Sequence, residues 1–181
     1  MNKLYVFSGA SGVGKSTVLG QVMSRRPDLR FSVSATTRDP RPGEVDGESY
    51  YFIDKARFEE MIREDAFVEY DAHMGNFYGT PKFQLEDKLE TGSVVLDIEP
   101  NGAFNVKRWR PDAVLIFIAP PSLEELERRL RGRGDTSEEQ IRIRQERVRW
   151  EMEQSEKYDH IVINDQVEAC VEEILAIMKE Q

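Results

Sequence analysis

Short apolar runs alternate along the chain with stretches in which apolar residues recur at helical spacing. The runs are typical of buried strands, and the helical recurrence is typical of amphipathic helices. The expected strands are Leu4–Ser8, Phe31–Ser34, Tyr50–Ile53, Phe67–Tyr70, Val94–Ile98, Val114–Ile118 and Ile161–Asn164. The expected helices are Ser16–Arg26, Lys55–Glu64, Lys82–Glu90, Gly102–Arg110, Leu123–Arg131, Glu138–Lys157 and Val167–Lys179. This alternation predicts an α/β fold with a central parallel sheet between helices, and the shorter runs around 31–80 indicate an inserted lobe.

A glycine-rich segment lies between the first expected strand and the first expected helix. It reads Gly9-Ala-Ser-Gly-Val-Gly-Lys-Ser16 and matches the P-loop pattern G-x-x-x-x-G-K-[ST]. Its glycines let backbone N–H groups point at phosphate oxygens, and the helix start adds N–H donors and a positive dipole end. Lys15 is expected to reach the β- and γ-phosphates, and the Ser16 hydroxyl to bind Mg²⁺.

The alternative for this segment is a chance glycine-rich turn. Because the flanking strand and helix stand where the motif needs them, we expect the chain to bind a nucleoside triphosphate. The residues expected to hold it are Gly9, Ala10, Ser11, Gly12, Val13, Gly14, Lys15, Ser16 and Thr17.

Length, net charge and cysteine content limit the domain number, the partners and the cellular location that we expect. The chain has 181 residues and a formal net charge of −9, which fits one domain and disfavours nucleic acid as a partner. No apolar stretch has the length of a membrane span, and the first expected strand leaves no room for a signal peptide. A single cysteine, Cys170, excludes an internal disulfide. We therefore expect a cytoplasmic protein without a membrane partner.

Arginine is concentrated in one segment of this acidic chain. Eight of the seventeen arginines lie between Arg128 and Arg149, and no lysine lies among them. Arginine is always charged and binds phosphate in a bidentate manner, so the segment is a candidate phosphate-facing region. The alternative is a solvated helical face whose arginines pair with Glu138, Glu139, Glu146 and Glu151.

The inserted lobe carries a second set of candidate residues. Arg38 and Arg41 flank Pro40 on a loop and could form a fork for a phosphate, which Tyr50 and Tyr78 could join. Glu69 lies in an alternating strand, and we expect a tight turn at 75–80. A carboxylate can accept two hydrogen bonds side by side, and guanine presents the matching pair of donors whereas adenine does not. Taken singly, each of these residues has an ordinary surface or core explanation.

Four stretches together resemble the guanylate kinase family of P-loop nucleoside monophosphate kinases. They read S-G-A-S-G-V-G-K-S-T, S-A-T-T-R-D-P-R-P-G-E-V-D-G-E-S-Y-Y-F, H-M-G-N-F-Y-G-T and R-R-L-R-G-R-G-D-T-S-E-E, and the similarity extends from about residue 4 to 165. The resemblance implies Mg²⁺-dependent transfer of a phosphoryl group from ATP to GMP, and dGMP as a further acceptor. It also implies a three-layer α/β/α core at about 1–31, 81–121 and 158–181. The GMP-binding lobe would lie at about 32–80 and a helical lid at about 122–157.

The resemblance also assigns roles to residues in the lobe and the lid. The positions that match the family's GMP phosphate site are Ser34, Arg38, Arg41, Tyr50 and Tyr78, and those that match its guanine site are Glu69 and Thr80. The lid positions that would reach the transferring phosphoryl group are Arg131, Arg133 and Arg144. We expect a solvated face for Arg128, Arg129, Arg142, Arg147 and Arg149. With Lys15 and Arg38, the three lid arginines make up the expected catalytic set.

One motif departs from the family pattern. After the strand at Val94 the chain reads Asp97-Ile-Glu-Pro-Asn-Gly102, where the family usually has Asp in place of Glu99 and Gln in place of Asn101. Carboxylates at the carboxyl end of a core strand lie where Mg²⁺ and the GMP base edge would converge. We therefore expect Asp97 and Glu99 to contribute to the GMP site, with either of them bound to Mg²⁺ through water, and we leave Asn101 unassigned.

Other functions remain open at this point. A guanylate-kinase-like binding module tends to lack the P-loop lysine, which is intact here. A related P-loop kinase acting on a sugar phosphate would not need Glu69 with Thr80. A GTPase should carry N-K-x-D, which does not occur. The partners expected are ATP and GMP, and the protein is expected to be a monomer or a small homo-oligomer.

Overall fold

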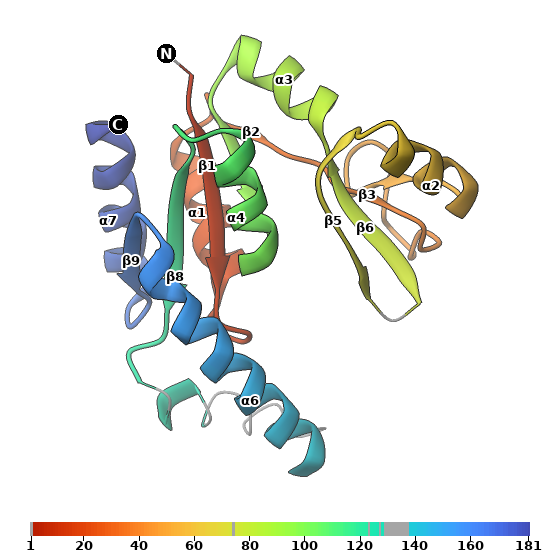
Figure 1. Ribbon diagram of the computed structural model, residues 1–181. Coiled ribbons are helices and arrows are strands. Elements are labelled where there is room, and N and C mark those ends of the chain that lie inside the picture. The colour runs from red at the N-terminus through yellow and green to blue at the C-terminus, as the bar shows by residue number, and fades with distance from the viewer. Residues whose placement is uncertain (1, 74, 123, 127, 129–137) are drawn as a thin grey trace. The chain divides into compact units, whose positions relative to one another are not determined.

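The computed structural model describes residues 2–73, 75–122, 124–126, 128 and 138–181. Its larger sheet has the strand order β2-β7-β1-β8-β9 (Figure 1). The strands are β1 (Leu4–Gly9), β2 (Arg30–Phe31), β7 (Val94–Asp97), β8 (Val114–Ala119) and β9 (His160–Ile163). The pairs β2/β7 and β8/β9 are parallel. This sheet and its helices confirm the expected α/β fold with a parallel central sheet.

The central strands are buried on both faces. All six residues of β8 are buried, and so are the first five residues of β1. Such continuous apolar strands are typical of a parallel sheet covered on both sides. The helices that belong with this part of the fold are α1 (Lys15–Arg25), α4 (Pro100–Trp109), α6 (Glu138–Gln154), η1 (Ser155–Lys157) and α7 (Val167–Glu180). Helix α7 packs against α1, and burial raises the pKa of the Cys170 thiol on α7 to about 11.

A second, four-stranded sheet is formed by residues 35–81 in the order β4-β3-β6-β5. The strands are β3 (Ala35–Thr36), β4 (Tyr51–Phe52), β5 (Phe67–His73) and β6 (Asn76–Pro81), and the helices next to them in the chain are α2 (Lys55–Arg63) and α3 (Lys82–Thr91). Helix α2 starts where the Asp54 carboxylate accepts the Arg57 N–H at 2.7 Å, a standard N-cap. The small core of this sheet consists of Ala35, Phe58, Met61 and Phe67.

Two of the expected elements are wrong in this region. The segment at 75–80 is mostly the strand β6, antiparallel to β5, and only Gly75, with φ of +80°, keeps a turn conformation. The strand expected at Phe31–Ser34 is divided, because the chain leaves the larger sheet after Phe31 and enters the smaller one at Ala35. Short apolar runs do not reveal which strand will be the partner, and that partner decides where each strand ends.

The other boundaries lie close to those expected. The helix expected at 138–157 is confirmed, with its last three residues in 3₁₀ conformation. Ser122 Oγ accepts the Glu125 N–H at 3.1 Å, as the capping box predicts. The second expected box, at Ser137 with Gln140, lies partly outside the described residues, as does most of the helix expected at 123–131. Among the helices that the structure describes, none is both long enough and apolar enough to cross a bilayer.

Contacts divide the chain into two compact units. The first comprises residues 1–5, 28–97 and 101–113 and includes the second sheet. The other comprises residues 6–27, 98–100 and 114–181 and includes the glycine-rich loop. The candidate residues therefore fall into two groups, one in each unit.

Candidate functional site

The glycine-rich loop adopts the conformation that its sequence predicts. Helix α1 begins at Lys15, directly after Gly14, whose φ of +91° is a left-handed conformation that glycine adopts without strain. The buried Asn164 side chain donates from Nδ2 to the Val13 carbonyl at 2.7 Å, and a Cβ on Gly14 would lie 3.1 Å from this nitrogen. The loop therefore ends at a helix N-terminus, where backbone N–H groups are available to a phosphate.

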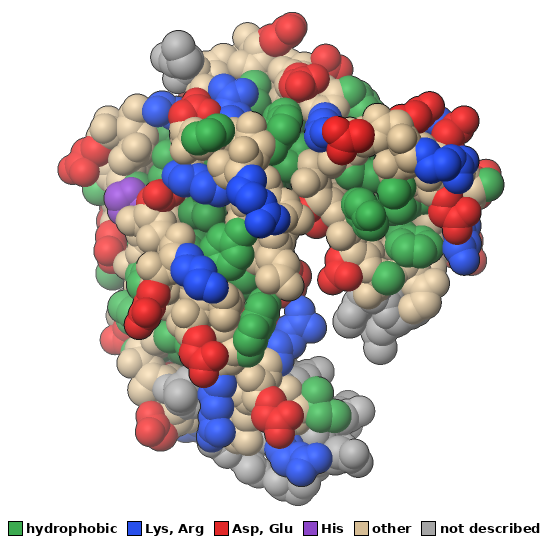
Figure 2. All heavy atoms as spheres, in the orientation of Figure 1, with side chains coloured by type: hydrophobic (Ala, Val, Ile, Leu, Met, Phe, Trp, Pro, Cys, Tyr) green, Lys and Arg blue, Asp and Glu red, His purple; other side chains and the backbone are tan. Residues whose placement is uncertain are grey.

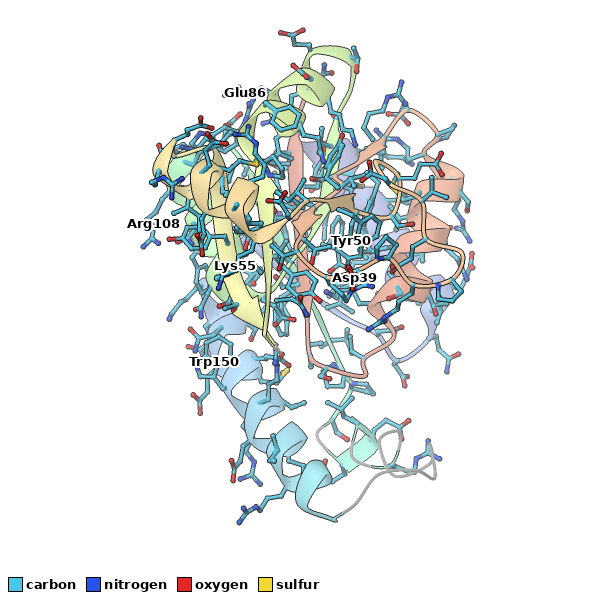
Figure 3. All side chains as sticks on the ribbon, turned by 90° about the vertical axis from the view of Figure 1, so that its right-hand side faces the viewer. Asp39, Tyr50, Lys55, Glu86, Arg108 and Trp150 are labelled. Atoms are coloured by element: carbon cyan, nitrogen blue, oxygen red, sulfur yellow. The ribbon has the colours of Figure 1, made fainter. Side chains whose placement is uncertain are left out.

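In the first unit, Arg38 is held as a fork by a carboxylate. Its Nη1 and Nη2 donate to the two carboxylate oxygens of Glu44 at 2.9 and 2.8 Å. The guanidinium lies over the Tyr50 ring at 5.5 Å from the centroid, and Asp39 and Tyr50 mark this corner in Figure 3. The hydrogen bonds from Arg38 lower the pKa of Glu44, so the pair is ionised at neutral pH. A planar cation fixed in this way is suited to a phosphate.

The other expected phosphate-site residues lie in the same unit as this fork. The Tyr50 and Tyr78 rings meet edge to face with centroids 6.1 Å apart. Arg41 is exposed, and its N–H donates to Glu44 at 2.7 Å. Ser34 directly precedes β3, and its carbonyl accepts the Tyr51 N–H at 2.9 Å. Within one unit, the structure therefore links Arg38 directly to Tyr50 and, through Glu44, to Arg41.

Glu69 and Thr80 form the second pair within this unit. They are partners across β5 and β6, and Thr80 Oγ1 donates to Glu69 Oε1 at 2.5 Å. Thr80 is fully buried, and burial also raises the pKa of the Glu69 carboxyl. The threonine contacts one oxygen of a carboxylate that has two, each with more than one lone pair, so Glu69 keeps capacity to accept further donors. The sequence-based pairing of these two residues is thus a direct contact.

Gly102 is an additional member of this group. A Cβ on Gly102 would lie 3.0 Å from Glu69 Oε2 and 3.2 Å from its carboxyl carbon. Such distances are tighter than ordinary van der Waals contact, so the carboxylate occupies space that only a glycine leaves open. Gly102 is in helix α4, where glycine is otherwise unfavourable by about 1 kcal/mol relative to alanine.

Gly102→Ala is expected to displace the Glu69 carboxylate and to lower kcat/KM for GMP by roughly tenfold, because overpacking typically costs about 1–3 kcal/mol. Gly20→Ala is the matched control, since Gly20 lies in helix α1 and a Cβ at that position would meet nothing within 4 Å. Steady-state kinetics with GMP on both variants makes the comparison. Equal kcat/KM values for the two variants would remove Gly102 from the site.

The raised pKa of Glu69 predicts a pH dependence. The carboxylate must be ionised to accept two donors, and burial moves its pKa above the ordinary glutamate value of about 4.3. We expect kcat/KM for GMP to fall as the pH decreases through this raised pKa, at a higher pH than an ordinary glutamate would give. In the pH profile of Glu69→Gln, this fall in kcat/KM should be absent, and only the fall caused by protonation of the GMP phosphate should remain. If Glu69→Gln showed the same fall in kcat/KM at acidic pH as the wild type, the assignment of Glu69 to the guanine site would be contradicted.

The two carboxylates of the motif at 97–102, which differs from the family pattern, lie in different units. Asp97 ends β7 and is half-buried in the first unit, whereas Glu99 belongs to the other unit. Glu99 is an ion-pair partner of Arg147 in helix α6, with 2.8 Å between Oε2 and Nη2. Glu99, the carboxylate that differs from the family pattern, is therefore paired with an arginine of the same chain.

The arginine-rich segment is only partly described. Arg131 and Arg133 lie outside the described residues, and of Arg144 the structure gives the backbone position in α6. Arg128 is exposed and pairs with Glu125 at 2.7 Å, as a solvated face predicts. Figure 2 shows acidic and basic side chains interspersed over this part of the surface.

For Arg147 the expected exposed position and the pairing with Glu151 are both observed, and a second partner, Glu99, is added. Arg147 pairs with Glu151 at 3.0 Å and with Glu99, and Glu151 is only 1% exposed. Helical spacing predicts the Arg147–Glu151 contact but not that the glutamate is buried against the glycine-rich loop.

Sequence reasoning missed Glu44, Gly102, Asn164 and the contact of Glu151 with the glycine-rich loop. The R-P-G-E block contains Glu44, and a carboxylate three residues after an arginine in a proline-stiffened loop could have indicated a partner for the fork. Gly102 could have been noticed as a glycine inside a helical pattern. The contacts of Glu151 and Asn164 with the loop carry no local signal, because they join residues far apart in the chain.

Comparisons with known proteins all lead to one family. A model of the guanylate kinase family matches residues 1–181. The chain is 50% identical over 177 residues to a guanylate kinase of Thermus thermophilus, which covers 97% of this chain and 80% of that protein. It is 47% identical over 173 residues to one from Nostoc, covering 95% and 87%. The crystal structure of guanylate kinase from Anaplasma phagocytophilum is similar with a TM-score of 0.76 and 32% identity, covering 99% of this chain and 85% of that one.

Proposed function

The chain belongs to the guanylate kinase family and transfers the γ-phosphoryl group of ATP to GMP, and we propose that the residues described above perform this reaction. The single observation that carries the assignment of residues is the Glu69–Thr80 contact with Gly102 beside it. This arrangement supports a role for the Glu69 carboxylate as the acceptor of hydrogen bonds from the N1–H and 2-amino groups of guanine. Adenine presents an acceptor at N1, which would face the same carboxylate without a proton between them.

The phosphate of GMP would be bound by the Arg38 fork with Tyr50, Tyr78, Arg41 and Ser34. In the structure Glu44 holds both nitrogens of the fork. A dianionic phosphate can bind the remaining guanidinium donors and the tyrosine hydroxyls while Glu44 keeps the fork in its plane. The phosphate oxygen of GMP is itself the nucleophile and is ionised at neutral pH, so this step requires no side chain as a general base.

The triphosphate of ATP would lie on the loop Gly9–Thr17. Backbone N–H groups at the start of α1 would surround the phosphates, and Lys15 would neutralise charge on the γ-phosphoryl group as it transfers. Arg131, Arg133 and Arg144 are proposed to neutralise the same group from the lid. Phosphoryl transfer offers the protein little covalent chemistry, so charge placement is its main contribution to the rate.

The donor chemistry of this chain also fits Mg²⁺, which prefers hydroxyl, carboxylate and phosphate oxygens and keeps several waters. Ser16 supplies a hydroxyl in the first turn of α1. Asp97 or Glu99 is proposed as the further ligand, through water. When bound, Mg²⁺ would offset negative charge on the phosphates of ATP. We also propose that the protein works in the cytoplasm as a monomer or small homo-oligomer, without nucleic acid or membrane partners; the lone cysteine and the acidic net charge support this.

A substrate panel tests the proposal. ADP release would be measured with ATP and each of GMP, dGMP, AMP, UMP and ribose 5-phosphate, with Mg²⁺ and after its removal by chelation. We expect activity with GMP and dGMP, little with AMP or UMP, and loss of activity on chelation that added Mg²⁺ restores. Comparable kcat/KM for AMP would contradict the guanine site, and preference for ribose 5-phosphate would favour the sugar-phosphate kinase.

A further inference from the structure

Helix α6 inserts a buried carboxylate against the glycine-rich loop. Glu151 is 1% exposed, and its Oε2 accepts the Ser11 N–H at 2.9 Å. Its Oε1 accepts from Arg147 Nε at 3.0 Å, one helical turn earlier. All three residues belong to the same compact unit. A buried carboxylate costs free energy unless it is paired and hydrogen-bonded, and here both oxygens have a partner.

The arginine in this contact also reaches the motif that departs from the family pattern. Arg147 Nη2 lies 2.8 Å from Glu99 Oε2, so one guanidinium joins two carboxylates. Burial raises the pKa of Glu151, whereas the Ser11 N–H and Arg147 lower it. Arg147 therefore offsets negative charge beside a loop that would bind a polyanion.

The loop is also fixed from a second direction. Asn164, directly after β9, donates to the Val13 carbonyl at 2.7 Å. Glu151 holds an N–H at Ser11 and Asn164 holds a carbonyl two residues later, on either side of Gly12. Two side chains from distant parts of the sequence thus restrain the same turn, and preorganised N–H donors bind an anion without a reorganisation cost.

We propose that Glu151 and Arg147 are positioning residues for the triphosphate loop, which tie the backbone at Ser11 to the helix that carries Arg144. Glu151 orients the loop through the Ser11 N–H, and Arg147 keeps that carboxylate neutralised and joins it to Glu99. The inference deepens the proposed ATP site and rests on that site being the loop Gly9–Thr17.

The test measures ATP affinity directly, with a fluorescent ATP analogue and Mg²⁺, on the full chain. The variants are Glu151→Ala, Glu151→Gln, Arg147→Met and the double variant R147M/E151Q. Arg149→Met, an exposed arginine on the same helix, is the matched control. Melting temperatures and KM values for ATP and GMP are recorded for every variant.

We expect Glu151→Ala to weaken analogue binding by roughly tenfold or more, because a hydrogen bond to a charged group is lost. Glu151→Gln should lose less, since its amide oxygen still accepts the Ser11 N–H. Arg147→Met should weaken binding by leaving the carboxylate unpaired, and the double variant should bind more tightly than Arg147→Met alone, because it removes that unpaired charge. The KM for GMP should stay within about twofold of the wild-type value.

Binding within about twofold of wild type for both Glu151→Gln and Arg147→Met would overturn the proposal, even if their melting temperatures fall. An equal rise in both KM values would also overturn it and would indicate general damage. If Glu151→Ala does not fold, the ordering of Arg147→Met and the double variant decides the matter. Failure of the proposed function would appear differently, as a wild-type protein that binds the analogue but does not phosphorylate GMP.

Discussion

Lys15→Ala is expected to lower turnover by roughly 10²–10³, the usual cost of removing one group that stabilises transition-state charge. The lysine is the first residue of α1 and directly follows the left-handed Gly14, so its position is set by the loop backbone. The alanine variant keeps a good helix former at the start of α1, and the fold should remain intact. The measurement is kcat with saturating ATP and GMP, together with the melting temperature.

Lys55→Ala is the control for the loss of a lysine. Lys55 also begins a helix, α2, and its side chain is 69% exposed (Figure 3). It should retain wild-type turnover. If Lys15→Ala kept more than about a third of wild-type turnover, far above the loss expected for such a group, the assignment of the ATP loop would be wrong.

Glu69→Gln is expected to lower kcat/KM for GMP by roughly 10² or more, because a buried donor would be left facing another donor. The glutamine keeps the size of the side chain and replaces one acceptor with an NH₂ group. Thr80 can still donate to the remaining oxygen, so the loss should fall on the guanine contacts. AMP should remain a poor substrate, since its N1 acceptor can pair with the new donor but its 6-amino group stands where guanine has an acceptor.

Asp71→Asn is the matched control for this change. Asp71 lies two residues further along β5 and is exposed. The substitution removes a negative charge from the same strand and leaves the Thr80–Glu69 hydrogen bond in place. If kcat/KM for GMP fell equally in Glu69→Gln and Asp71→Asn, the loss would be due to the charge of the strand. A specific role for Glu69 would then be excluded.

The α/β fold and most boundaries could be predicted because buried parallel strands and amphipathic helices leave strong local patterns. The glycine-rich loop could also be predicted from local sequence, because its conformation depends on its own glycines. The hairpin of β5 and β6 was not, because the pairing of Glu69 with Thr80 that defines it involves residues eleven positions apart. Strand β6 contains Gly79 and Pro81 and directly follows Gly75, and such residues favour a turn on local grounds alone.

The contacts around the site were the least predictable. Residue types indicated that Arg38 could form a fork, but only the fold shows that Glu44 holds both of its nitrogens. Arg147 illustrates the same limit: its spacing predicts the contact with Glu151 but not the second ion pair, with Glu99. Its role depends on Glu151 being buried against Ser11, which lies 140 positions away in the chain.

The most direct test of phosphoryl transfer to GMP follows phosphorus itself. Phosphorus NMR of a mixture of ATP, GMP and Mg²⁺ would be recorded during the reaction with the wild-type protein. We expect the GMP signal to decrease while the signals of ADP and GDP increase together, with no matching rise of inorganic phosphate. Inorganic phosphate appearing in place of GDP, or an unchanged GMP signal while ATP is consumed, would contradict transfer to GMP.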